Sequence, residues 1–269
     1  MCSSDLSTTR RFESGLSLSR YSYRIDRFNT YYDDLGFGIG QTREKLDAPD
    51  GFNLVQADIA YVFDNSFFGV TAPMQGARSR YQIMGTTGSY NYFTTLLDYR
   101  KYFFIKPVSL AFRFYNYNRF GRDAESGRIV PLYLGYPYLI RGYDGTSGKR
   151  NYVSALTINQ LAGSRLVVTN AEIRIPLTGP RKLSLIKSKF LFTDIALFFD
   201  GGLVWDSQHH PELKWQFTSS DDRIPLFSGG ISLRVNIFGY MVVEPFYAIP
   251  LQDGGFNNAS FGINFIPGW

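Results

Sequence analysis

Apolar and polar side chains alternate along most of this chain, and the alternating runs are long. From Gly230 to Ile237, isoleucine, leucine or valine occupies every second position. The same period of two recurs in the segments that start at Val55, Val108 and Val167. A period of two predicts strands with one apolar and one polar face, and no segment shows a convincing helical period. We therefore predict an all-β chain.

The length of the alternating runs separates two kinds of β protein. Runs such as 10–25, 90–104 and 106–120 extend over about fifteen residues. Strands of soluble proteins are typically about 5–6 residues long, whereas a tilted strand needs about 9–11 residues to cross a membrane. The lengths favour a transmembrane antiparallel β-barrel over a soluble sandwich.

The composition is compatible with such a barrel and excludes other classes. Aromatic residues make up 17% of the chain, and the mean hydropathy is only −0.15, as expected when strands alternate. No apolar run approaches the roughly 18 residues of a membrane-spanning helix. The net charge of +5 is scattered, which argues against nucleic-acid binding. The one cysteine, Cys2, excludes an internal disulfide or a cysteine-based metal cluster.

The alternation predicts eleven strands joined by two longer polar loops, at about 121–162 and 206–222. Bacterial single-chain barrels have an even number of strands, and no signal peptide follows Met1. We therefore expect a partial barrel over 10–269 that lacks N-terminal strands, preceded by a disordered or artefactual start at 1–9. The predicted strands are 10–25, 30–41, 52–62, 77–88, 90–103, 106–120, 163–177, 189–205, 225–237, 240–250 and 258–267.

A candidate ion pair links the first long loop to a later strand. The loop carries Arg141, after an aromatic-rich approach at 135–138. In the strand around Asp200, alternation directs Phe198, Asp200 and Gly202 into the lumen. A buried carboxylate is costly without a cation, and the planar fork of arginine can bind it through two hydrogen bonds. We predict that Arg141 pairs with Asp200.

These motifs resemble those of the bacterial surface-antigen barrels, the superfamily of the BamA and TamA assembly factors. The sixth extracellular loop of that family carries an Arg-Gly-aromatic tip, which here reads Ile140, Arg141, Gly142 and Tyr143. Its thirteenth strand typically reads Phe-x-Asp-x-Gly, as in 198–202. The resemblance is clear from about residue 135 to 269. It implies a barrel of sixteen strands, of which this chain is the C-terminal part, with the loop folded into the lumen and its arginine on the acidic residue of the strand.

The end of the chain resembles the terminal strand that the outer-membrane assembly machinery reads. Gly262 and Phe265 fit that signal, and Trp269 supplies the terminal aromatic residue. Pro267 departs from the pattern, because proline cannot donate to a strand ladder.

The resemblance implies a function without chemical catalysis, so we expect no enzyme activity, no cofactor and no metal. The barrel would insert or translocate client proteins at the outer membrane of a Gram-negative bacterium, in contact with lipid and the assembly machinery. Two alternatives stay open: a barrel that anchors or exports a missing N-terminal domain, such as a lipase or β-propeller, and a passive pore.

Three other motifs are weak. The glycines of 36–40 lack the spacing and the following helix of a nucleotide loop and are interpreted as strand glycines. The adjacent histidines His209 and His210 make a poor metal site. Asp221 and Asp222 are interpreted as a solvated loop rather than a calcium site.

Overall fold

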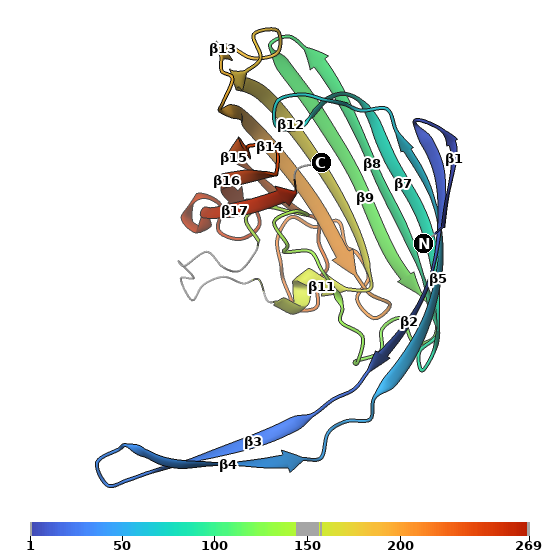
Figure 1. The fold of residues 1–269 in the computed structure, drawn as a ribbon, viewed down its shortest axis with the longest axis vertical. Helices are drawn as coiled ribbons and strands as arrows, with labels where there is room; N and C mark the ends of the chain where they lie inside the picture. Colours follow the sequence, from blue (N-terminus) through green and yellow to red (C-terminus); the bar gives the residue numbers. More distant parts are fainter. Residues whose placement is uncertain (1, 144–155, 157, 268–269) are drawn as a thin grey trace.

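The fold is a single large antiparallel β-sheet with two long excursions. The computed structural model describes residues 2–143, 156 and 158–267. Within them the main path of the sheet follows the order β1-β2-β5-β7-β8-β9-β12-β14-β15-β16-β17 (Figure 1). The strands are β1 (Cys2–Ser7), β2 (Arg10–Tyr21), β5 (Phe52–Asp64), β7 (Pro73–Gly88), β8 (Tyr92–Ile105), β9 (Val108–Phe120), β12 (Arg165–Gly179), β14 (Phe192–Trp205), β15 (Leu226–Ile237), β16 (Met241–Pro250) and β17 (Ser260–Pro267).

The sheet curves strongly but stays open in the part of the chain that the structure describes. Each strand of the main path pairs with the next, and β1 and β17 form the two ends. Two short strands lie beside the path: β6 (Phe67–Phe68) pairs with β7, and β13 (Ile186–Lys187) with β12. The predictions of an all-β fold and of about eleven strands in one antiparallel sheet are confirmed. Closure into a barrel is not seen.

The predicted strand at 30–41 is wrong, because that segment contains a tight turn. Strands β3 (Ile25–Tyr32) and β4 (Gly38–Leu46) pair with each other as a separate hairpin. The Asp33 carboxylate accepts hydrogen bonds from the backbone N–H groups of Leu35 and Phe37, and Gly36 has a φ of 84°. Local side-chain capping of this kind favours a turn over a continuous strand. The hairpin projects from the ends of β2 and β5 (Figure 1), which pair directly with each other.

The amino-terminal segment also differs from the expectation of disorder over 1–9. Residues Cys2–Ser7 form β1, which pairs antiparallel with β2 from Cys2 opposite Ser14 to Ser7 opposite Arg10. Residues 8 and 9 are the turn between the two strands.

The connections at the two ends of the sheet differ in length. Because the strands alternate in direction, the hairpin β3–β4 and the loops after β9 and β14 emerge at the same end. The loop after β9 contains β10 (Leu132–Tyr133), the 3₁₀ turn η1 (Ile158–Leu161) and β11 (Ala162–Gly163), and it lies on the concave side of the sheet (Figure 1). Among the described residues, no helix is long and apolar enough to cross a membrane.

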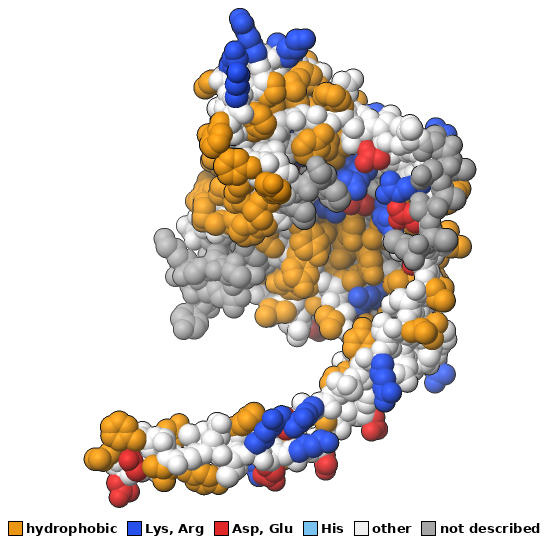
Figure 2. Space-filling view, viewed as in Figure 1, with side chains coloured by type: hydrophobic (Ala, Val, Ile, Leu, Met, Phe, Trp, Pro, Cys, Tyr) orange, Lys and Arg blue, Asp and Glu red, His pale blue; other side chains and the backbone are white. Residues whose placement is uncertain are grey.

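The two faces of the sheet differ in exposure as the alternation predicts. On β14, Ile195, Leu197 and Phe199 are exposed on the outer face, whereas Phe198 and Asp200 are buried on the concave face. Acidic and basic side chains gather inside the hollow, and hydrophobic side chains cover the flank formed by the C-terminal strands (Figure 2). The apolar core is therefore not a second layer behind the sheet. It lies between the concave face and the loop after β9.

Candidate functional site

The loop after β9 carries its apolar tip into the hollow of the sheet. The backbone N–H groups of Leu139 and Ile140 donate to the carbonyl of Tyr136, 2.8 and 3.1 Å away, which closes a turn before the tip. Ile140 is fully buried and belongs to a cluster with Val168 of β12 and Leu226 of β15, among others. This packing sets the depth at which the next residue, Arg141, enters the hollow.

Arg141 and Asp200 form the two-bond ion pair that the alternation predicts. The Nε and Nη2 atoms of Arg141 lie 2.7 and 2.8 Å from the two carboxylate oxygens of Asp200. The backbone N–H of Arg141 donates to the same carboxylate over 3.2 Å. Asn170 of β12, opposite Asp200 in the strand register, donates to it from 2.9 Å. The Asp200 side chain has no exposed surface, so these donors replace the water that it loses.

Two further carboxylates bind Arg141, and the sequence interpretation missed both. Glu172 of β12 lies 2.9 Å from Nη2, and Glu244 of β16 lies 3.1 Å from Nη1. The loop tip is therefore tied to three strands rather than one. Both glutamates occupy concave-facing positions, and that alternation was the signal available in the sequence. The curvature of the sheet decides which inward carboxylates lie close together, and alternation does not predict that curvature.

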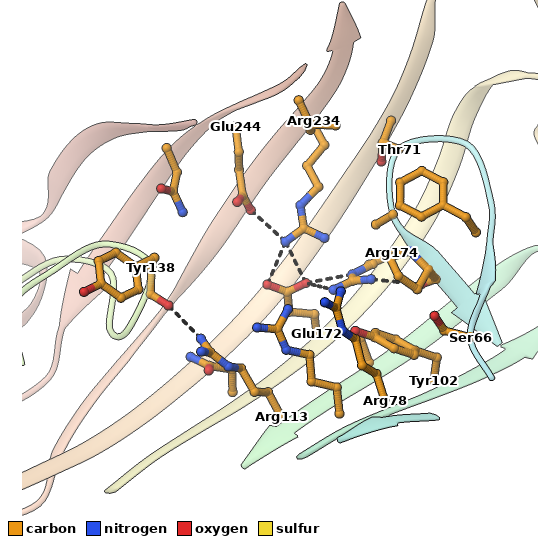
Figure 3. A pocket seen from close by; sticks show the side chains of 18 of the residues that line it. Ser66, Thr71, Arg78, Tyr102, Arg113, Tyr138, Glu172, Arg174, Arg234 and Glu244 are labelled. Carbon is orange, nitrogen blue, oxygen red and sulfur yellow. Dashed lines mark hydrogen bonds and ion pairs between the residues drawn. The ribbon is translucent and has the colours of Figure 1, made fainter. Parts of the chain in front are cut away.

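Arg174 and Arg234 balance the excess negative charge of this group. Arg174 lies 2.7 Å from Glu172, and Nη2 of Arg234 lies 2.9 Å from Glu172 and 3.1 Å from Glu244 (Figure 3). Three arginines thus face three carboxylates, all nearly buried. We name Arg141, Arg174, Arg234, Glu172, Asp200 and Glu244 the arginine latch. Charges buried at this depth are tolerable only when each is paired.

Small and aromatic residues shape the space around Arg141. The guanidinium carbon lies 3.6 Å from the ring centroid of Phe198, a cation–π contact. Gly142 has a φ of 90°, and a Cβ on it would lie 3.1 Å from the Cβ of Ala248. A Cβ on Gly202 would lie 2.8 Å from the side chain of Leu134 in the loop. Glycine is therefore needed at both positions for the loop to approach the sheet closely.

Tyr143 secures the far side of the loop tip. Its hydroxyl donates to the carbonyl of Phe227, 2.9 Å away, and contacts the side-chain oxygen of Gln252 at 3.0 Å. Burial raises the pKa of the Tyr143 phenol, so the hydroxyl keeps its proton for donation. All four residues of the predicted tip, Ile140 to Tyr143, are buried and contribute to its attachment.

Gly262 and Phe265, two of the predicted residues of the terminal strand, lie on the edge strand β17. Gly262 is opposite Phe246 of β16, and a Cβ on Gly262 would lie 2.3 Å from the Phe246 ring. The Phe265 side chain is exposed, and Pro267 ends the pairing opposite Met241. Trp269 lies outside the described residues.

The remaining motifs have structural partners of their own. His209 lies 2.9 Å from the Asp206 carboxylate within one loop, and hydrogen bonds from Thr218 lower the pKa of Asp222. The glycines of 36–40 belong to the turn and the first residues of β4. Among the described residues, no three histidine, cysteine or acidic side chains are placed to hold a metal ion.

The chain was also compared with known proteins. No family model and no curated protein matches it.

Proposed function

We propose that this chain is part of the wall of an outer-membrane β-barrel that inserts or translocates other proteins. The observation that carries the proposal is the arginine latch, in which a long loop enters the hollow of the sheet and its tip binds β12, β14 and β16. The wall of a simple water-filled pore would not require an inserted loop that is held by three buried carboxylates.

The outer face of the sheet supports a membrane location. Large apolar side chains stay exposed there on successive strands, among them Ile83, Phe112, Ile173, Leu197 and Ile231. Soluble proteins rarely expose so large a continuous apolar surface, whereas a spanning barrel turns such a band toward lipid. Aromatic residues at the short-turn end, Phe190, Phe238 and Tyr240, are exposed as well, as in the aromatic girdles at membrane interfaces.

The inserted loop argues for an assembly role over a passive pore. Leu134, Leu139 and Ile140 fill space inside the hollow that an open channel would leave to water. A barrel that assembles other proteins would offer a strand edge at its seam, where backbone N–H and C=O groups can pair with an incoming strand. The partners of this proposal are lipid, client proteins and the assembly machinery.

Reconstitution with a client tests the proposal directly. The purified full-length protein is placed in liposomes, an unfolded outer-membrane barrel is added, and folded client is quantified by its resistance to heat in gels. We expect faster client folding than in empty liposomes, and a loss of this effect in Arg141→Ala but not in Arg27→Ala, whose arginine lies on the exposed hairpin. No acceleration by the folded protein would overturn the assembly role. A large steady conductance in its place would point to a pore.

A further inference from the structure

A pocket of about 700 Å³ lies next to the arginine latch on the concave face. Strands β7, β8, β9 and β12 contribute to its wall, and the loop residues Pro137 and Tyr138 border it. Figure 3 shows arginine side chains from several strands that point into this space.

A short connection folds into the hollow and borders the pocket opposite the loop. It runs from residue 65, just after β5, to residue 74, the second residue of β7, and Thr71 and Met74 within it are buried. The Thr71 hydroxyl donates to the carboxylate of Asp194 on β14. The carbonyl of Val70 accepts from Asn236 on β15 over 3.2 Å. We name residues 65–74 the inward turn. The pocket is therefore bordered by the loop tip from one end of the sheet and by the inward turn from the other.

Arginines outnumber carboxylates among the side chains that line the pocket. Of the described residues that line it, seven are arginines and three are carboxylates. The carboxylates of the region are shared among several arginines: Asp98 binds both Arg100 and Arg113. Each of the seven arginines has an acidic partner, and together they bind six carboxylates, so the guanidinium groups outnumber the carboxylates that they bind by one.

One of these guanidinium groups also has an unsatisfied donor. Arg234 is 5% exposed, and its Nε is buried without a hydrogen-bond partner. A buried donor without an acceptor is costly and calls for an explanation. A bound anion would supply the missing acceptor and would also balance the excess of guanidinium groups.

We propose that this pocket binds the phosphate group of an anionic ligand. Guanidinium forks match phosphate oxygens with paired hydrogen bonds. A single carboxylate offers only two oxygens, whereas a phosphate or diphosphate group offers enough acceptors for arginines on β7, β8, β12 and β15. The volume is within the range of small-ligand sites, about 300–1,000 Å³. The same chemistry is carried by a soluble phosphate compound and by a lipid headgroup.

Calorimetric titration of the full-length protein, folded in uncharged detergent, tests the site. The probe is inorganic pyrophosphate at low salt, since screening weakens such contacts. Arg100 is the residue to change, because it lines the pocket without contacting Arg141. We expect Arg100→Gln to weaken binding about tenfold or more, as for a lost hydrogen bond to a charged group. Arg20→Gln removes the same charge from an exposed arginine outside the pocket and should leave binding unchanged.

A second titration separates the two sources of phosphate. Short-chain phosphatidic acid that binds more tightly than pyrophosphate and is displaced by it would support a lipid headgroup. Pyrophosphate binding alone would support a soluble ligand. No binding of either probe to the folded protein, or equal weakening by Arg20→Gln, would overturn the site. The measurement involves no client protein, so its failure would leave the assembly role intact. Arg78→Gln, on β7, provides a second variant if Arg100→Gln does not fold.

Discussion

The exposed hairpin and the arginine latch use the same chemical pair in opposite surroundings. On the hairpin, Arg27 binds Glu44, and the two side chains are 54% and 52% exposed. In the latch, Arg141 binds Asp200, and the side chains are 5% and 0% exposed. Exposed pairs contribute little to stability because water solvates and salt screens both charges. A buried pair cannot lose one member without leaving an uncompensated charge.

This difference shows which ion pairs of the molecule fix its shape. The hairpin can project from the sheet because its two strands form backbone hydrogen bonds with each other. Its exposed charges are solvated and need no partner elsewhere in the molecule. The latch arginine is a loop residue held by carboxylates on β12, β14 and β16. The loop position therefore depends on the latch, whereas the hairpin position depends on its backbone ladder.

The largest effect is expected from removal of the latch arginine. Arg141→Ala leaves three buried carboxylates without their shared cation, so we expect a loss of about 3–5 kcal/mol in the free energy of unfolding. Urea titration of the protein folded in micelles measures it. Arg27→Ala removes the same side chain from the hairpin and should cost no more than about 1 kcal/mol. Equal losses would break the comparison.

A smaller effect is expected from the glycine that follows Arg141. Gly142→Ala forces a residue with a Cβ into a positive φ and against Ala248, at a cost of about 1–3 kcal/mol. Gly40→Ala on the hairpin is the matched control, since a Cβ there meets no atom within 4 Å. The same urea titration applies. A Gly142→Ala variant as stable as Gly40→Ala would show that the tip does not approach the sheet as described.

The inward turn extends the comparison to a neutral donor. Thr71→Val removes the hydroxyl that donates to the buried Asp194, and we expect a loss of about 1–3 kcal/mol. Thr42→Val on the hairpin removes a hydroxyl that contacts Tyr31 in an exposed setting, with an expected change within about 0.5 kcal/mol. If the two variants unfold at the same urea concentration, the turn does not lie in the hollow in solution.

The alternating pattern predicts much of this architecture but not its folded-back segments. It identifies ten of the eleven main-path strands, apart from a few residues at their ends, and it places Asp200 on the concave face. The hairpin turn after Tyr32 was missed because aromatic residues on both sides continue the apparent alternation. The inward turn was missed, although Phe67, Phe68, Val70 and Met74 make it more apolar than a solvated connection. Its position depends on contacts with Asp194 and Asn236, which are distant in sequence.

The candidate site was predictable to the same extent. Alternation places Asp200 on the inward face. Because a buried carboxylate is costly without a cation, Asp200 predicts a cationic partner, for which the long loop offers Arg141. Alternation places Glu172 and Glu244 on the inward face but does not distinguish them from the other inward polar residues. Their convergence on Arg141 follows from sheet curvature and loop depth, which are tertiary properties.

The smallest effect concerns acid at the loop end of the sheet. Glu125 accepts hydrogen bonds from Ser164 and from Ser207. Partial burial raises the pKa of Glu125, but these hydrogen bonds outweigh it, and the pKa lies below its ordinary value of 4.5. A carboxyl group whose pKa is lower in the folded than in the unfolded protein stabilises the folded state at pH values above its unfolded pKa. This stabilisation is lost as the pH falls through the pKa of the folded state.

We therefore expect the contact between the two loops to loosen only below about pH 4.5. Hydrogen exchange of the Ser207 amide, corrected for its intrinsic rate, should show protection at neutral pH that disappears in acid. Glu125→Gln should lack that pH dependence. A transition at higher pH, or one that persists in Glu125→Gln, would assign it to another group.

A pair of double-mutant cycles tests the central claim most directly. One cycle combines Arg141→Ala with Asp200→Ala, and the other combines Arg27→Ala with Glu44→Ala, each measured by urea unfolding of the full-length protein. The account predicts a coupling energy above about 1.5 kcal/mol for the latch pair and below about 0.5 kcal/mol for the hairpin pair. A latch coupling as small as that of the hairpin would contradict it, because the loop tip would then not be held in the hollow by Arg141.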